Sequence, residues 1–123
     1  MKIVIAGAGD VGSHLAKLLA SESHDIYLID RSEDNLNAVS SQIDVFTITG
    51  DAKSVEIMEH KLIESCDLLI AVTSSEETNM LICILGKKLG AKRTIARIND
   101  VNIVINIYIK YLLIIISFYI IFF

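Results

Sequence analysis

Residues 1–12 read MKIVIAGAGDVG, and this stretch predicts the fold of the chain. The apolar run at 3–6 is typical of a buried strand, and the G-x-G-x-x-G pattern that follows it leads into a helix. In this pattern the first glycine permits a tight turn, the second lets a pyrophosphate approach the backbone, and the third lets the helix pack against the strand. The amides at the start of the helix face the phosphates. The alternative is a plain strand–helix turn, but we expect a nucleotide at Gly7, Ala8, Gly9, Asp10, Val11 and Gly12.

The rest of the first hundred residues repeats this alternation between strand and helix. Four more apolar runs predict strands, and they lie at 26–29, 45–48, 68–72 and 93–96. Near-continuous apolar strands suit a parallel sheet that is covered on both faces. With right-handed crossovers, the sequence predicts an α/β fold, a Rossmann-like doubly wound parallel sheet in the strand order 3-2-1-4-5. We expect this nucleotide-binding domain to cover residues 1–100.

The helices between these strands are predicted from their end signals. The first covers residues 10–20, and a short one follows Ala52. Ser32 is a good N-cap for a second helix. The last helix is expected to begin after Ser74, because a glutamate three residues later completes a capping box, and to end at Gly90.

Composition and charge exclude several classes of protein and of partner for this chain. The 123 residues leave room for one domain, and the hydrophobic share of 53% excludes a disordered tail. A formal net charge of −4 excludes a nucleic-acid-binding arm, so no nucleic-acid partner is expected. Cys66 and Cys83 lie too far apart for a metal knuckle, and the histidines lack a second ligand at metal spacing, so no metal is expected. The first residues are too quickly interrupted by glycine for a secretory signal, which favours a cytosolic location.

Asp30 closes the second predicted strand, 18 residues after Gly12. An acidic side chain at this place hydrogen-bonds the adenosine ribose, and its charge repels a 2′-phosphate, which favours NAD over NADP. Arg31 is the contrary signal, because a neighbouring arginine can accept that phosphate. The alternative role of Asp30 is that of an acid at the start of the next helix, beside Ser32.

Further candidates follow the later strands at their carboxyl ends, where open α/β sheets bind ligands. Asp51 and Ala52 follow the third strand and are expected to flank the adenine. Thr73 and Ser74 follow the fourth strand, close to the point where the strand order reverses, and Ser74 has the alternative role of a helix cap. Arg97 ends the fifth strand and would answer the charge of a phosphate, with a plain surface arginine as the alternative.

The joint pattern of motifs resembles one family. Besides the glycine loop, the sequence contains LID at 28–30, GDA at 50–52, AVTSSEETNM at 71–80 and AKRTIAR at 91–97. Together these motifs are similar to the amino-terminal domain of TrkA-type potassium uptake regulators, which belong to the RCK/KTN family. The resemblance covers roughly the first hundred residues.

The resemblance implies a regulatory subunit that is not an enzyme. Such a subunit is cytoplasmic, peripheral to the inner face of the membrane, and binds NAD(H) or, in some members, ATP or ADP. Its partner would be a membrane potassium-translocating subunit, and it would form a homo-oligomer if the full family domain is present. Carried onto this chain, the nucleotide contacts fall on Gly7–Val11, Asp30, Thr73, Ser74 and Arg97, with Asp51 and Ala52 near the adenine.

Two other functions compete with this one. A small NAD-dependent oxidoreductase would share the glycine loop, but it needs a substrate pocket and acid–base groups that a second domain usually supplies. Another dinucleotide-binding module, or one for S-adenosylmethionine, would share the loop and the acid at the end of the second strand. Turnover of a hydroxy acid or ketone would favour the oxidoreductase, and a preference for S-adenosylmethionine would favour the module.

The composition changes from residue 98 onward. Of the 26 residues at 98–123, 22 are Ile, Asn, Tyr, Lys, Phe or Leu, and each of these amino acids has a codon made only of A and T. We therefore expect 101–123 to be an apolar, isoleucine-rich tail outside the family fold, a truncation or frameshift product that replaces the family's further helices and strand. A membrane anchor at 103–123 is one alternative, opposed by Asn106 and Lys110 within it. An edge strand at 103–109 is the other.

Overall fold

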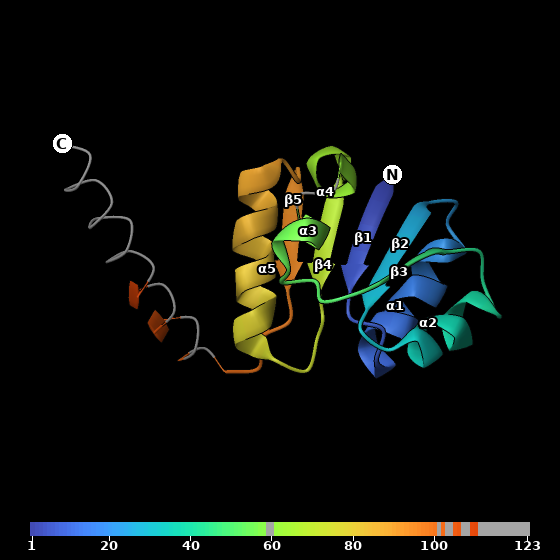
Figure 1. Cartoon of the computed structure of the whole chain (residues 1–123), viewed down its shortest axis with the longest axis horizontal. Helices are drawn as coiled ribbons and strands as arrows, with labels where there is room; N and C mark the ends of the chain where they lie inside the picture. Colours follow the sequence, from blue (N-terminus) through green and yellow to red (C-terminus); the bar gives the residue numbers. More distant parts are fainter. Residues whose placement is uncertain (59–60, 101, 103–104, 107–108, 111–123) are drawn as a thin grey trace.

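The computed structural model describes residues 1–58, 61–100, 102, 105–106 and 109–110 of the chain. Its centre is a sheet of parallel strands in the order β3-β2-β1-β4-β5 (Figure 1). The strands are β1 (Lys2–Ala6), β2 (Asp25–Asp30), β3 (Phe46–Thr49), β4 (Leu68–Ala71) and β5 (Arg93–Ala96). The predicted fold class and strand order are confirmed, and each predicted strand end lies within one residue of the observed one.

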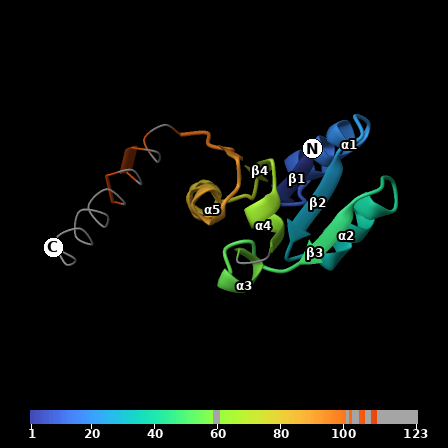
Figure 2. The same cartoon turned by 90° about the horizontal axis from the view of Figure 1, so that it is seen from above.

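The connecting helices lie on both sides of the sheet (Figure 2). They are α1 (Asp10–Ala20), α2 (Glu33–Ser40), α3 (Val55–Met58), α4 (Lys61–Ser65) and α5 (Glu76–Leu89). The predicted limits of the first helix are confirmed. The short helix predicted after Ala52 is helical at its described residues, Val55–Met58 and Lys61–Ser65, and residues 59–60 between them lie outside the described residues.

Each face of the sheet carries its own hydrophobic core. Along β1, Ile3 and Ile5 belong to one core and Val4 and Ala6 to the other, because successive strand residues face opposite sides. The Ile3–Ile5 core is closed by residues of α1 and α2, namely Ala16, Leu36 and Val39. The Val4–Ala6 core is closed by residues of α4 and α5, namely Leu62, Ile63, Ile82 and Cys83. β1 is therefore buried on both faces, as its unbroken apolar run predicts.

The helix caps follow the sequence signals with one exception. The Ser32 hydroxyl accepts a hydrogen bond from the backbone N–H of Asn35 at 3.2 Å, which confirms the predicted cap of α2. At α5 the prediction that Ser74 is the cap is wrong. Ser75 caps the helix instead, and its hydroxyl accepts the N–H of Thr78 at 3.2 Å. The loop after β4 is one residue longer than the capping-box pattern assumed, so that α5 begins at Glu76 and the residue before it is Ser75.

The described residues of the tail are helical and exposed. They are residues 102, 105–106 and 109–110, so the alternative of an edge strand at 103–109 is wrong at the residues that can be assigned. An alternating pattern made almost wholly of apolar residues does not separate strand from helix, which explains the error. In the part of the chain that the structure describes, no helix is long and apolar enough to cross a membrane. Residues 111–123 lie outside the described residues, and with them most of the tail predicted at 101–123 and of the alternative anchor at 103–123.

Two glycines of the first loop are required by the backbone. Gly7 has a φ of +110°, and a Cβ there would lie 2.9 Å from the carbonyl carbon of Val72. A Cβ on Gly12 would lie 1.7 Å from the carbonyl oxygen of Gly7, because α1 passes directly against the loop. Gly9 differs, since its φ is −74° and a Cβ there would meet no atom within 4 Å.

We predict that alanine lowers the stability of the fold strongly at Gly12 and only slightly at Gly9. Alanine gains about 1 kcal/mol over glycine as a helix former, but the overlap at Gly12 forces α1 away from the loop and costs more than this gain. Gly12→Ala is therefore expected to lower the free energy of unfolding by about 1–3 kcal/mol. Gly9→Ala is the matched control and is expected to lower it by less than about 1 kcal/mol, because alanine is only a poorer N-cap there and meets no clash. Urea unfolding followed by circular dichroism measures both, and equal stabilities of the two variants would contradict the role of Gly12.

Candidate functional site

A cleft with a volume of about 770 Å³ runs along the carboxyl ends of the strands. The loop after β1 lies at its centre, the ends of β2 and β3 form one side, and the ends of β4 and β5 form the other. The chain crosses from one side of β1 to the other here, and such switch points are where open α/β sheets hold ligands. The volume is that of a site for a small molecule or cofactor.

Most of the residues that the sequence predicted for the site come together in this cleft. Its lining includes Gly7, Gly9, Asp10, Val11, Asp30, Asp51, Ala52, Thr73, Ser74 and Arg97. They come from five separate strand ends, and the parallel sheet brings those ends to one edge. Their role toward a ligand stays a prediction.

Ala8 and Gly12 are the two predicted residues that do not line the cleft. The Ala8 side chain is buried in the core beneath the loop, and its backbone N–H points to Asp30. Gly12 lies against the carbonyl group of Gly7. Both residues therefore determine the shape of the loop and contribute no lining surface.

Seven lining residues were not among the predicted site residues. They are Arg31, Asn35, Gly50, Lys53, Val72, Ser75 and Thr78. Five of them are chain neighbours of predicted residues at the same strand ends, so a wider window at each strand end would have included them. Asn35 and Thr78 lie in the first turns of α2 and α5, and only the direction of those helices brings them to the cleft.

Asp30 joins the glycine loop to the start of α2. Its Oδ2 accepts the backbone N–H of Ala8 at 2.7 Å, and its Oδ1 accepts the backbone N–H of Ser32 at 2.8 Å. The carboxylate thus supports the loop and the helix start together, and the alternative role beside Ser32 is part of what this residue does. Each carboxylate oxygen carries two lone pairs, so both oxygens retain capacity toward the cleft.

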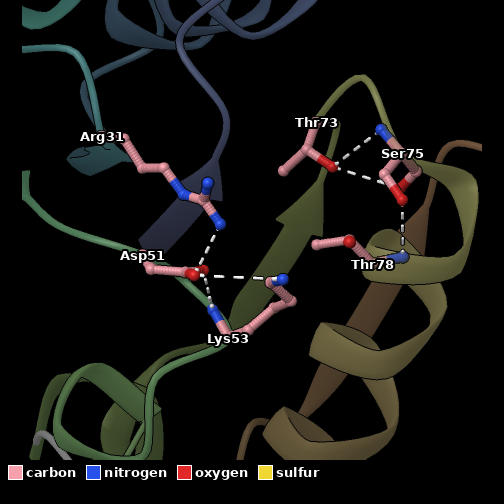
Figure 3. Close-up of polar contacts among 6 residues, drawn as sticks. All are labelled: Arg31, Asp51, Lys53, Thr73, Ser75 and Thr78. Atoms are coloured by element: carbon pink, nitrogen blue, oxygen red, sulfur yellow. Dashed lines mark hydrogen bonds and ion pairs between the residues drawn. The ribbon is translucent and has the colours of Figure 1, made fainter.

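Asp51 gathers two cations at the end of β3 (Figure 3). Its Oδ2 lies 2.6 Å from Nη2 of Arg31 and 4.0 Å from Nζ of Lys53. The Lys53 backbone N–H donates to Oδ1 at 2.8 Å and lowers the pKa of the Asp51 carboxyl, burial opposes this shift, and the Arg31 guanidinium lowers the pKa further. The side chains are exposed, so the pair contributes little to stability. The ion pair keeps the Arg31 guanidinium next to the Asp51 carboxylate.

The loop between β4 and α5 is closed by its own side chains on the other side of the cleft (Figure 3). The Thr73 hydroxyl oxygen accepts the Ser75 N–H at 3.3 Å and lies 3.2 Å from the Ser75 carbonyl oxygen. The Ser75 hydroxyl in turn caps α5. These bonds place Ser74 at the cleft with its cap role taken by its neighbour, so its ligand role remains the open prediction.

Among the described residues, no cysteine or histidine lines the cleft. Cys66 and Cys83 are both buried and unpaired, and burial raises the pKa of the Cys83 thiol to about 11, which keeps it neutral. Within the described ranges, no group of three His, Cys, Asp or Glu side chains could hold a metal ion. The cleft instead offers carboxylates on one side, hydroxyls and Arg97 on the other, and backbone N–H groups at the centre. The lining thus combines groups of both charges with hydroxyl groups and backbone N–H donors.

Comparison with known proteins places this arrangement in a family. The family model described as "TrkA-N domain" matches residues 3–111. The Trk system potassium uptake protein TrkA homolog of Archaeoglobus fulgidus is 40% identical over 100 residues, which is 81% of this chain and 22% of that protein. The homolog of the same name from Pyrococcus abyssi is 37% identical over 101 residues, covering 81% of this chain and 44% of that protein.

Solved structures share the fold. The Kef CTD of Shewanella denitrificans, in its AMP-bound form, superposes with a TM-score of 0.61 at 24% identity, covering 76% of this chain and 55% of that one. The chain spans less than half the length of the two curated relatives.

We predict that Asp30→Ala destabilises the fold itself. The substitution leaves the backbone N–H groups of Ala8 and Ser32 without their charged acceptor, which is expected to cost about 1–3 kcal/mol in the free energy of unfolding. Urea unfolding measures this loss. Asp25→Ala, at the exposed opposite end of the same strand, is the matched control and should leave the stability within about 0.5 kcal/mol of the original. A stable Asp30→Ala variant would show that the two hydrogen bonds are dispensable.

Proposed function

The chain belongs to the TrkA-N domain family, and we propose that it is the regulatory, nucleotide-binding part of a Trk-type potassium uptake system. In this proposal it acts from the cytoplasm at the inner face of the membrane, on a potassium-translocating subunit within the membrane. The observation that carries the proposal is the cleft, in which ten predicted site residues from five strand ends meet around the glycine loop.

The centre of the cleft fits a pyrophosphate. α1 has Gly9 as its N-cap and no side-chain cap, whereas serine hydroxyls cap α2 and α5. The first-turn N–H groups of α1 are thus left for a ligand, and the helix dipole favours a negative charge there. A Cβ on Gly9 would meet nothing within 4 Å, which is the space that a phosphate would occupy.

The β2–β3 side of the cleft fits the adenosine half of a nucleotide. Asp30 would hydrogen-bond the ribose hydroxyls through the lone pairs that the backbone leaves free, and Asp51 and Ala52 would flank the adenine. Arg31 is paired with Asp51, so the charge that would attract a 2′-phosphate is already balanced. We therefore propose NAD(H) as the ligand rather than NADP(H). ATP and ADP share the adenosine half and are proposed as further ligands.

The proposed role is binding without catalysis. On the β4–β5 side, Thr73, Ser74 and Arg97 would hold the second half of the dinucleotide, and none of them is an activated acid, base or nucleophile. When the ligand binds, its ribose hydroxyls would bond to Asp30 and its phosphate charge would attract Arg97, and these contacts would draw the two sides of the cleft together. That change in the domain is the signal we propose for the membrane subunit, and assembly into a homo-oligomer would transmit it.

Isothermal titration calorimetry of the purified chain tests the binding part of the proposal. We expect NADH to bind and NADPH to bind at least about tenfold more weakly, because the Asp30 charge repels the 2′-phosphate. ATP, ADP and S-adenosylmethionine are titrated in the same buffer, and mixtures of NADH with ketones or NAD with hydroxy acids are followed at 340 nm. Tightest binding of S-adenosylmethionine, or turnover in these mixtures, would contradict the proposal.

We predict that Gly9→Val abolishes NADH binding and leaves the chain folded. The valine side chain would project into the space proposed for the pyrophosphate, where no protein atom lies within 4 Å of its Cβ. Calorimetry measures the binding and circular dichroism the fold.

The same pair of proteins, with residues 1–97 exchanged into a full-length TrkA, reports on the regulatory part. The original sequence is expected to give NADH-dependent potassium uptake, and Gly9→Val to give uptake that no longer responds. Normal binding by Gly9→Val would show that the loop does not hold the phosphates.

A further inference from the structure

We propose that Asn79 is a positioning residue of the nucleotide cleft, which holds the loop after β4 and the end of β5 together as one rigid wall. Asn79 itself does not line the cleft; it lies on α5 beneath the wall. The inference rests on the proposed function, since it concerns the same cleft. It gives a role to a residue that lies within the AVTSSEETNM motif at 71–80 but outside the lining of the cleft.

The Asn79 side chain fixes Thr73 at three points. Its Oδ1 accepts the Thr73 backbone N–H at 2.8 Å and the Thr73 hydroxyl at 2.6 Å. Its Nδ2 donates to the Thr73 carbonyl oxygen at 3.2 Å. The backbone and the side chain of Thr73 are therefore both oriented by one amide. The loop that continues to Ser75 starts from this fixed residue.

The same amide reaches the end of β5. Nδ2 of Asn79 also donates to the carbonyl oxygen of Arg97 at 3.0 Å, while the Arg97 N–H continues the strand pairing by donating to Ala71 at 2.9 Å. The backbone from which the Arg97 guanidinium extends is thus held on both sides. In the first turn of α5, the Glu76 carboxylate accepts the N–H groups of Asn99 and Asp100 at 3.0 and 3.4 Å and supports the following residues.

Burial shows that packing alone does not explain this asparagine. Among the described residues, Asn79 is the polar side chain that is fully buried, at 0% exposure. Asparagine is a poor helix former, and a buried amide is costly unless its hydrogen bonds are satisfied. A leucine of similar size would serve the core better. Every side-chain bond of Asn79 instead ends on Thr73 or Arg97, two residues of the cleft wall, so its contribution is their position.

Asn79→Leu in the full chain tests the inference, with Ile82→Ala as the matched control. Ile82 is equally buried, one turn further along the same helix, and its loss loosens α5 without removing a polar contact to the wall. For each folded protein, calorimetry gives the affinity for NADH and NMR titration the affinity for adenosine. Adenosine reports on the β2–β3 side alone, so a merely structural defect would change both affinities or neither.

The expected result is a split between the two ligands. Asn79→Leu should lower the affinity for NADH about tenfold and change the affinity for adenosine by less than about twofold. Ile82→Ala should change both affinities by less than about twofold. If Asn79→Leu does not fold, Asn79→Asp takes its place. It keeps the acceptor for the Thr73 N–H and hydroxyl, loses the donor to the carbonyl oxygens of Thr73 and Arg97, and should show the same split. Unchanged NADH affinity, or equal losses for both ligands, would overturn the inference. A wild-type chain that binds no NADH would refute the proposed function, which is a different failure.

Discussion

Helix α1 and the glycine loop lie so close that no side chain fits between them at Gly12, where a Cβ would come within 1.7 Å of the Gly7 carbonyl oxygen. This contact fixes the start of α1 above the carboxyl end of β1, at the middle of the sheet. The helix N-terminus and its unsatisfied N–H groups therefore point into the cleft and not into solvent beside it. The site depends on this approach, because the cleft residues at the other four strand ends are placed relative to β1 by strand pairing.

The two sides of the cleft are held by opposite kinds of polar group. On the β2–β3 side, a carboxylate accepts backbone N–H groups, and Asp30 joins the loop to α2 in this way. On the β4–β5 side, an amide both accepts and donates, and Asn79 joins Thr73 to Arg97. An ionised carboxylate is an acceptor only, whereas an asparagine can satisfy an N–H and a carbonyl together. The β2–β3 side has two backbone N–H groups to satisfy, and a carboxylate accepts both. The β4–β5 side has an N–H and a carbonyl oxygen to satisfy, and an amide bonds to both.

Much of the fold could be predicted because its signals are local. The apolar runs gave the strands to within one residue, and Ser32 gave the start of α2. The errors arose where local signals were ambiguous. Ser74 and Ser75 are adjacent candidates for the same cap, and the bonds of Thr73 decide between them. The alternating apolar residues after 102 suit a strand or a helix equally, and the described ones are helical.

By itself, the sequence determined the order of elements, the glycine loop and the residues at each strand end, because strand-ending residues in a parallel sheet must meet at one edge. Only the tertiary structure decided what those residues do to one another. It turned Ala8 and Gly12 away from the lining, paired Arg31 with Asp51, and gave the Asp30 carboxylate two backbone N–H groups to hold. It also placed Asn79 beneath residues 6 and 18 positions away in the chain. Such contacts depend on distances between elements, and no pattern within a single segment contains them.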